Sequence, residues 1–416
     1  MRGLYLMLHL YNTMSRSIEP FKPRKKGEVS IFTCGPSIYR RPHIGNYRTF
    51  IYEDILLKYL EYSGYRVHRA IPLTDIEDKT ILEAIRHRKK IEEITGNVEK
   101  IFFSEAKTLK IRLSEKVQRT SECVECSATM IRALIDKGHA YRHGGDIFFA
   151  PLTFPGFGKL FRLDMKRWPK KTVRFKHDTY NGNRWNLGDF ILWHGYREGD
   201  IKWWDSSIGK GRPSWNIQDP SVVIQHLGRQ IDINCGGIDN IYRHHDYNIA
   251  IMESFTGLEY ARYYMHGEHL VVDGRPMSKS LGNILYPGDI FKHGCSARDL
   301  RLFLFHKHYR KKLNFTKKRF QESCVRMTYL HGCALGLLKA GRRESGGSPR
   351  VRELIRRIPA VFEKEMDDDL STGAAYDAVF STITELGKHG SVMTRKDAAD
   401  LRAALARIDA VLGVIL

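Results

Sequence analysis

Two short segments of the chain contain residues suited to binding phosphate. His43-Ile44-Gly45-Asn46 follows an apolar run at 29–34 and precedes a helical pattern of apolar residues, so we expect it at a strand-to-helix turn. Backbone N–H groups at the start of a helix bind anions. Far along the chain, the segment 276–283 places Lys279 among small polar residues, where its ammonium group can neutralise a departing pyrophosphate. The two segments therefore predict chemistry on ATP.

A parallel sheet with helices on its faces is the expected support for these segments. Strand and helix patterns alternate at the start of the chain, which is typical of an α/β fold with a Rossmann-like doubly wound sheet. The expected elements are a strand at 29–34, a helix at 46–63, a strand at 66–72, a helix from about 78, helices at 101–113 and 121–138, an apolar segment at 230–234, a helix from about 244 and a strand at 263–272.

Changes in composition divide the chain into four expected regions. Aromatic and turn residues after Gly138 indicate a β-rich insertion, and apolar residues at helical spacing dominate the last third. We expect the first half of a Rossmann-like catalytic domain at 1–138, a β-rich connective region at 139–205, the second half of the catalytic domain with the 276–283 loop at 206–295, and a helical bundle at 296–416 with helices at 316–341, 351–365, 372–388 and 396–413.

The composition excludes several classes of protein. With 416 residues and 42% hydrophobic content, the chain can bury a large core. It has no run of about 20 apolar residues and no secretory leader at its start. Seven scattered cysteines do not suggest a disulfide framework. We therefore expect a cytoplasmic monomer with no membrane association.

The positive charge is clustered, which suggests a nucleic acid partner. The chain has 68 Lys and Arg against 47 Asp and Glu, a formal net charge of +21. Much of the excess lies at 159–176 and 306–319, where a phosphate backbone could be neutralised; a solvated basic face is the alternative. We predict that RNA binds the 306–319 segment through four side chains: Lys311, Lys312, Lys317 and Lys318.

From about Met7 onward the chain resembles the cysteinyl-tRNA synthetases, a family of class I aminoacyl-tRNA synthetases. Eight blocks occur in the family's order, which is far more specific than a single four-residue match. The blocks lie at 10–13, 32–39, 42–50, 73–79, 209–215, 236–239, 244–245 and 366–369.

The resemblance implies that the protein activates an amino acid with ATP and Mg²⁺ and transfers it to tRNA. His43, Asn46 and Lys279 are the implied catalytic residues, while Pro276 replaces a second lysine that the family usually has. The implied amino-acid site contains Cys34, Thr74, Trp215 and Asp239, and the implied ATP site contains Gly35, His43, Gly45, Asn46, Gly236, Gly237, Met277, Ser278, Lys279 and Ser280.

The family's zinc site is altered in this chain. In the family, two cysteines, a histidine and a glutamate hold a Zn²⁺ ion that binds the substrate thiolate. Cys34 and His244 match, but Asp219 stands at the second cysteine position and Asn248 at the glutamate position. Cys235 is an alternative ligand. We predict weakly held zinc and weak discrimination of cysteine from serine, because a neutral amide is a poor zinc ligand.

Two further features concern the molecule that accepts the activated amino acid. The family usually continues into a domain that contacts the anticodon, and this chain ends at Leu416, about where that domain would begin, so we expect tRNA to bind mainly through its acceptor arm. Residues 1–6 precede the family's usual start. Two alternatives remain open: a ligase that joins an amino acid to a small amine, and a catalytically inactive paralogue that binds RNA.

Overall fold

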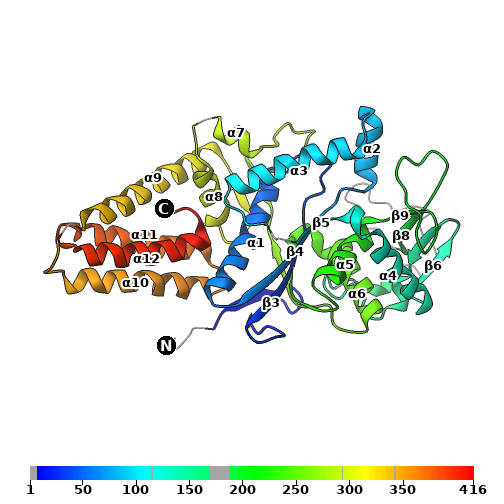
Figure 1. Ribbon diagram of the computed structural model, residues 1–416, viewed down its shortest axis with the longest axis horizontal. Coiled ribbons are helices and arrows are strands. Elements are labelled where there is room, and N and C mark those ends of the chain that lie inside the picture. Colours follow the sequence, from blue (N-terminus) through cyan, green and yellow to red (C-terminus); the bar gives the residue numbers. More distant parts are fainter. Residues whose placement is uncertain (1–6, 114–115, 168–187, 293, 342) are drawn as a thin grey trace.

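The computed structural model describes residues 7–113, 116–167, 188–292, 294–341 and 343–416, so the unusual start at 1–6 lies outside it. A parallel sheet forms the centre of the molecule, a helical bundle lies on one side and a smaller β-rich part on the other (Figure 1). No helix among these residues is both long and apolar enough to cross a membrane.

The central sheet has five parallel strands in the order β11-β10-β3-β4-β5. The predicted doubly wound α/β architecture is confirmed, because the chain runs outward from the middle of the sheet in both directions. The elements are β3 (Glu28–Thr33), α1 (Ile44–Tyr62), β4 (Arg66–Leu73), β5 (Lys116–Arg119), β10 (Ile231–Gly237), α6 (Asp246–Thr256) and β11 (Ala261–Gly267).

The two faces of this sheet belong to different hydrophobic cores. Ile31 of β3 packs into a core shared with α1 and the bundle, whereas the next residue, Phe32, packs into a core shared with α5 (Trp215–His226) and α6. Alternate residues of a strand point to opposite faces, so a near-continuous apolar strand can serve both cores. Helices α2 (Asp78–His87) and α3 (Ile91–Thr108) connect β4 to β5, and α4 (Val124–Asp136) lies between β5 and the insertion.

The insertion is a four-stranded antiparallel sheet. Its strands are β6 (Ala140–His143), β7 (Asp146–Phe149), β8 (Phe190–Gly195) and β9 (Gly211–Pro213), in that order. Strand β9 lies beyond the predicted end of the insertion at 205. Phe190 stacks on Tyr247 of α6 with ring centroids 3.9 Å apart, so aromatic packing joins the insertion to the catalytic core.

The C-terminal part is helical, as the apolar spacing predicts. Its helices are α8 (Ala297–His306), α9 (Lys317–Ala340), α10 (Pro349–Met366), α11 (Thr372–Gly387) and α12 (Arg395–Leu412). Arg301 of α8 ties this region to the catalytic core: it lies 2.7 Å from Asp54 of α1, and both side chains are buried.

Two predicted elements are wrong in detail. The expected strand at 263–272 is two strands in different sheets, because the chain leaves the central sheet after Gly267. β12 (Leu270–Val272) pairs with β13 (Arg275–Pro276) and β14 (Leu313–Phe315), and this small sheet carries the 276–283 loop, followed by α7 (Pro287–Phe291). The expected helix at 101–113 is the second half of α3. A hairpin of β1 (His9–Asn12) and β2 (Ser17–Pro20) precedes the sheet.

Candidate active site

The predicted site residues gather where the carboxyl ends of the central strands meet. Cys34 follows β3, Thr74 follows β4 and Asp239 follows β10. Strands β3 and β10 are neighbours whose connections leave in opposite directions, and such a switch point is where ligands bind doubly wound sheets. A Cβ on Gly35 would lie 1.6 Å from the carbonyl oxygen of Pro72, so only glycine fits there.

His43 and Asn46 cap the start of α1 reciprocally. The backbone N–H of Asn46 donates to Nδ1 of His43 at 3.3 Å, and the backbone N–H of His43 donates to Oδ1 of Asn46 at 3.0 Å. The caps occupy Nδ1 and Oδ1, which leaves Nε2–H of His43 and the NH₂ group of Asn46 as donors. Burial lowers the pKa of His43, so its ring is neutral at pH 7.

The 276–283 loop lies against this cap. A Cβ on Gly45 would lie 2.8 Å from Cε of Met277, and the backbone N–H of Ile44 donates to the carbonyl oxygen of Leu285 at 2.9 Å. Asn283 holds the loop together, since its Oδ1 accepts from the N–H of Ser278 at 2.9 Å. Ser278 and Ser280 share a hydroxyl hydrogen bond of 3.1 Å, and Lys279 between them is exposed.

Gly236, Gly237 and Asp239 form the turn after β10. Asp239 is exposed in the short 3₁₀ turn Ile238–Asn240, and its carboxylate opposes the lowering of the His43 pKa by burial, which places the two groups in one electrostatic environment. A Cβ on Gly237 would lie 2.6 Å from Oδ1 of Asp239. The glycines therefore keep the backbone open beside the carboxylate.

Trp215 and Thr74 come from two separate segments that lie close to the carboxyl ends of the strands. Trp215 is the first residue of α5 and stacks on His244 with ring centroids 5.1 Å apart. Thr74 joins the segment after β3 through a backbone bridge with Ser37. Glu77, which the sequence reasoning missed, is buried near these groups, and burial raises its pKa. Its place in the 73–79 block was the available signal.

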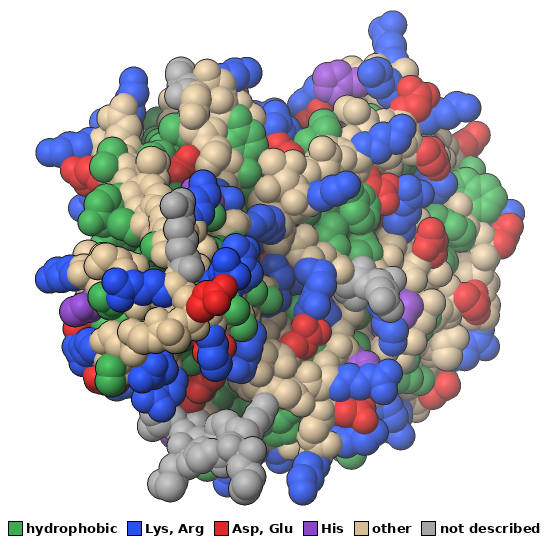
Figure 2. Space-filling model, turned by 60° about the vertical axis from the view of Figure 1, so that its left-hand side comes forward, with side chains coloured by type: hydrophobic (Ala, Val, Ile, Leu, Met, Phe, Trp, Pro, Cys, Tyr) green, Lys and Arg blue, Asp and Glu red, His purple; other side chains and the backbone are tan. Residues whose placement is uncertain are grey.

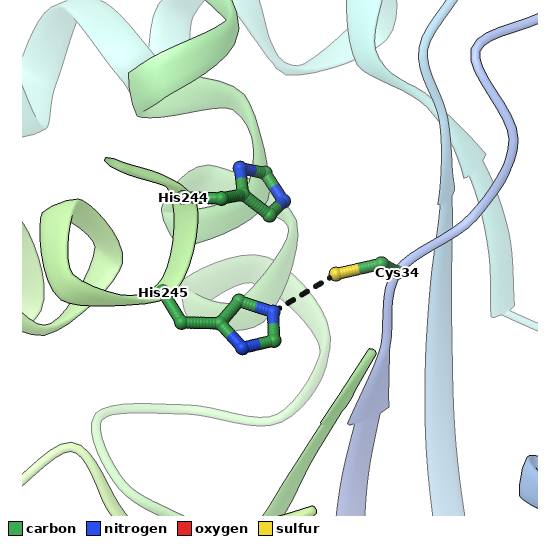
Figure 3. Close-up of side chains that lie close together, drawn as sticks. All are labelled: Cys34, His244 and His245. Atoms are coloured by element: carbon green, nitrogen blue, oxygen red, sulfur yellow. Dashed lines mark hydrogen bonds between the residues drawn. The ribbon is translucent and has the colours of Figure 1, made fainter. Parts of the chain in front are cut away.

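Three of the predicted metal ligands lie together. His244 Nε2 lies 2.8 Å from Oδ2 of Asp219, and Cys34 Sγ lies 3.9 Å from the same oxygen. His245, which was not predicted, is also part of the cluster: its Nε2 lies 3.1 Å from Cys34 Sγ (Figure 3). Burial, helped by the Asp219 carboxylate, raises the pKa of the Cys34 thiol.

The alternative ligand Cys235 lies elsewhere. It is buried in the core that contains Tyr52 and Ile55 of α1, because its strand position directs it away from the face that Phe32 shares with α6. A rearranged site containing Cys235 is therefore not what the structure forms. Asn248 is also buried, and neither atom of its amide has a hydrogen-bond partner among the described residues.

Part of the predicted basic track has a structural role. Arg310 pairs with Asp369 at 2.6 Å, and Lys159 pairs with Glu253 at 2.6 Å. Residues 168–176 lie outside the described residues. Lys and Arg side chains are spread over the face shown in Figure 2. The four lysines predicted to bind RNA are exposed, and no ion pair is recorded for them among the described residues: Lys311, Lys312, Lys317 and Lys318.

A doubly wound sheet whose first helix begins with the His43-to-Asn46 turn, with the 276–283 loop against that turn, is the core of a class I aminoacyl-tRNA synthetase. Residues 20–325 match the family model for the tRNA synthetases class I (C) catalytic domain, and residues 361–416 match the DALR domain. The chain belongs to the cysteine–tRNA ligase family of these synthetases.

The sequences of curated relatives match this chain along almost its whole length. The cysteine–tRNA ligase of Chlamydia muridarum is 33% identical over 422 residues, which cover 98% of this chain and 88% of that protein. That of Chlamydia abortus is 34% identical over 414 residues, covering 98% and 86%.

Solved structures support the fold. A methionyl-tRNA synthetase of Mycobacterium tuberculosis in complex with methionyl-adenylate matches with a TM-score of 0.70, 14% identity and coverage of 93% of this chain and 92% of that chain. A leucyl-tRNA synthetase of Agrobacterium radiobacter in a ternary complex with tRNA matches with a TM-score of 0.65, 12% identity and coverage of 95% and 85%.

Proposed function

We propose that the protein activates an amino acid with ATP and Mg²⁺ as an aminoacyl-adenylate and transfers the aminoacyl group to tRNA. Cysteine is the first substrate to test, because the curated relatives are cysteine–tRNA ligases. The observation that carries the proposal is the contact between the two phosphate-binding segments, at Gly45 and Met277. It brings donors from both segments to one place at the sheet's switch point.

The roles of the catalytic residues follow from this contact. Charge develops on the phosphate oxygens as the substrate carboxylate attacks the α-phosphorus of ATP, and donors fixed in advance lower the energy of that transition state. His43 Nε2–H and the Asn46 amide are such donors, because their caps fix both side chains. Lys279 neutralises the departing pyrophosphate from an exposed position on the loop. The glycines 35, 45, 236 and 237 let the nucleotide approach the backbone.

The amino acid binds beside Cys34. Asp239 holds the α-ammonium group, since a carboxylate is the natural partner for that charge. Trp215 and Thr74 form walls of the side-chain pocket. Cys34, Asp219 and His244 are suited to Zn²⁺ by their donor atoms, and the ion, when bound, supplies a Lewis acid for the substrate thiol.

The tRNA acceptor arm is proposed to lie along the exposed lysines at 311–318. To test this, all four are changed to Ala, and a matched variant changes four exposed lysines of the α2–α3 region, Lys89, Lys90, Lys100 and Lys107. Each phosphate contact contributes about 0.9 to the slope of log affinity against log salt. The first variant should flatten that slope and weaken binding of any tRNA, while the control, with the same net charge, should not.

Aminoacylation of a full tRNA and of an acceptor-stem minihelix completes this test. Comparable charging of both supports recognition through the acceptor arm, and a sharp dependence on anticodon bases contradicts it. If adenylate forms but no RNA binds above background at low salt, the acceptor is a small amine. If no amino acid supports adenylate formation, the protein is an inactive paralogue.

A further inference from the structure

Two cysteines from separate segments bring their thiol groups into contact at the junction of α8 and α9. Cys295 lies between α7 and α8, Cys324 lies in α9, and the two are 29 positions apart in the chain. Their Sγ atoms are 3.7 Å apart, which is van der Waals contact, and the S–H group of Cys324 donates to Cys295. Both residues are partly exposed, so the pair is not sealed inside the core.

We propose that Cys295 and Cys324 are a redox-active dithiol site, which a small-molecule disulfide converts into an intramolecular disulfide within the native fold. A disulfide bond is about 2.05 Å long, so the two sulfur atoms must approach each other by about 1.7 Å. Rotation about the Cα–Cβ bond of each residue moves its sulfur on this scale.

The packing of α8 against α9 keeps the two thiols together. The two helices are side by side (Figure 1), and Phe303 of α8 meets Phe320 of α9 edge to face, with ring centroids 5.4 Å apart. Phe320 is one helical turn before Cys324. Both cysteines also pack against the larger hydrophobic core. Since this packing holds the two backbones in place, the sulfur atoms meet through side-chain rotation.

A different pair would be expected from sequence spacing alone. Cys123 and Cys126 have the C-x-x-C spacing of many redox sites. The structure directs these two thiols to separate acceptors, because Cys123 Sγ lies 3.1 Å from Oε1 of Gln225 and Cys126 Sγ lies 3.6 Å from the carbonyl oxygen of Ser221. The contact between thiols is made instead by two cysteines that are far apart in the sequence.

The contact gives the two thiols different roles. Cys295 accepts the S–H of Cys324, so the Cys295 sulfur is the one that is stabilised as a thiolate. Burial, helped by the Asp299 carboxylate, raises the pKa of the Cys324 thiol, which disfavours its thiolate. The thiolate is the nucleophile in disulfide exchange. Cys295 is therefore the attacking thiol, and Cys324 is the thiol that closes the bond.

The exchange has two steps. The Cys295 thiolate attacks one sulfur of a disulfide RSSR, which forms a mixed disulfide on Cys295 and releases RS⁻. Cys324 then gives its proton to the released thiolate and attacks Cys295 Sγ, which breaks the mixed disulfide and releases a second RS⁻. This second thiolate takes up the proton that Cys295 lost when it ionised. The protein thus loses two electrons and two protons, and two molecules of RSH form.

The new bond closes a ring that contains the basic segment 306–319. It also ties the segment that follows α7 to the middle of α9. A cross-link over this span removes conformations from the unfolded chain, so the oxidised protein should resist unfolding more than the reduced protein.

The test uses full-length protein and oxidised glutathione as the small-molecule disulfide. Reduced protein is equilibrated with it, quenched by alkylation and digested. Mass spectrometry should find a peptide in which Cys295 and Cys324 are linked, and dithiothreitol should abolish it. The oxidised protein should also show a higher urea midpoint than the reduced protein. Because no ATP, amino acid or tRNA is present, the outcome is independent of the proposed function.

Three serine variants test the roles of the two thiols. Cys324→Ser should stop at a glutathione adduct on Cys295, whereas Cys295→Ser should form its adduct on Cys324 about tenfold more slowly or less. Cys333→Ser is the matched control, because Cys333 is also a partly exposed residue of α9. It lies about 13 Å along the helix from Cys324, beyond the reach of Cys295, and its replacement should leave the cross-link unchanged.

Four results would overturn the proposal. They are the absence of the linked peptide in folded wild-type protein, a cross-link mainly between Cys123 and Cys126, an oxidised protein with a lower urea midpoint than the reduced protein, and equally fast adducts in Cys295→Ser and Cys324→Ser. The third result would mean that the bond strains the packing of α8 against α9. If a variant does not fold by circular dichroism, the peptide map of the wild type decides.

Discussion

His43 and Asn46 each cap the other's backbone at the start of α1, through hydrogen bonds of 3.0 and 3.3 Å. The arrangement uses one atom of each side chain for structure and leaves the other as a hydrogen-bond donor. Structure and chemistry at this turn can therefore be separated by substitutions that keep the cap and remove the donor.

Asn46→Asp is the substitution that makes this separation. The carboxylate keeps an oxygen for the N–H of His43, and it suits the positive end of the helix, but it replaces the donor NH₂ with an acceptor that repels phosphate. We expect unchanged thermal stability and about 10²-fold slower adenylate formation. Asn46→Ala should lose both the capping oxygen and the donor NH₂ group, so it should slow adenylate formation and also lower stability by about 1 kcal/mol. An Asp variant with full activity would contradict the donor role.

The His43 cap predicts a dependence of stability on pH. Burial lowers the pKa of His43 below its ordinary value of 6.5, so the unfolded chain binds the proton more readily than the folded one. The contribution of neutral His43 to the free energy of unfolding is present above pH 6.5 and is lost as the pH falls toward the pKa of His43 in the folded protein. His43→Asn keeps a capping oxygen without titrating, so urea unfolding between pH 7.5 and 5 should show a shallower loss in this variant. An equal loss of stability with falling pH in the wild type and in His43→Asn would contradict the assignment of this pH dependence to His43.

Gly45 connects the two phosphate-binding segments. A Cβ there would lie 2.8 Å from Cε of Met277 and 3.0 Å from Nδ1 of His43. Gly45→Ala should therefore displace the loop and slow adenylate formation about tenfold or more, since small misplacements at a reacting centre cost that much. Adding Met277→Ala removes one of the two close contacts and should restore part of the rate. If the double variant forms adenylate no faster than Gly45→Ala, the contact of the new Cβ with His43 alone explains the slower rate.

Arg301 and Asp54 hold the bundle against the catalytic core. The two groups are 2.7 Å apart, with side-chain exposures of 1% and 0%. Arg301→Met leaves a buried carboxylate whose remaining ion pair among the described residues is with Lys58, and urea unfolding should show a loss of about 3 kcal/mol. Arg326→Met breaks a comparable but partly exposed pair with Asp377 and should cost less than about 1 kcal/mol. Equal costs would contradict the burial argument.

Much of the catalytic core could be predicted from the sequence because its signals are local. The turn at 43–46 joins an apolar strand to a helical pattern, and the predicted start of α1 lies two residues from the observed one. The bundle helices repeat apolar residues at helical spacing. The chain's exit from the central sheet at Gly267 was missed, because β11 and β12 are both apolar and only tertiary pairing separates them.

The metal cluster shows why the remaining part of the site needed a structure. The resemblance to the cysteinyl-tRNA synthetases implied Cys34, Asp219 and His244 by position, but two adjacent histidines in a regular helix would point about 100° apart. The non-helical backbone at Tyr242 and Arg243 brings His245 to the same cluster. No local sequence pattern predicts that turn. Cys235 was a reasonable alternative by residue type, yet its strand position directs it to the opposite core.

The most direct test of the central claim is amino-acid-dependent exchange of pyrophosphate into ATP, screened over all twenty amino acids with wild-type protein and Lys279→Ala. The account predicts exchange with cysteine in the wild type and a rate lower by about 10²-fold or more in the variant, which lacks the cation that meets the departing pyrophosphate. No exchange with any amino acid, or an undiminished rate in Lys279→Ala, would contradict it.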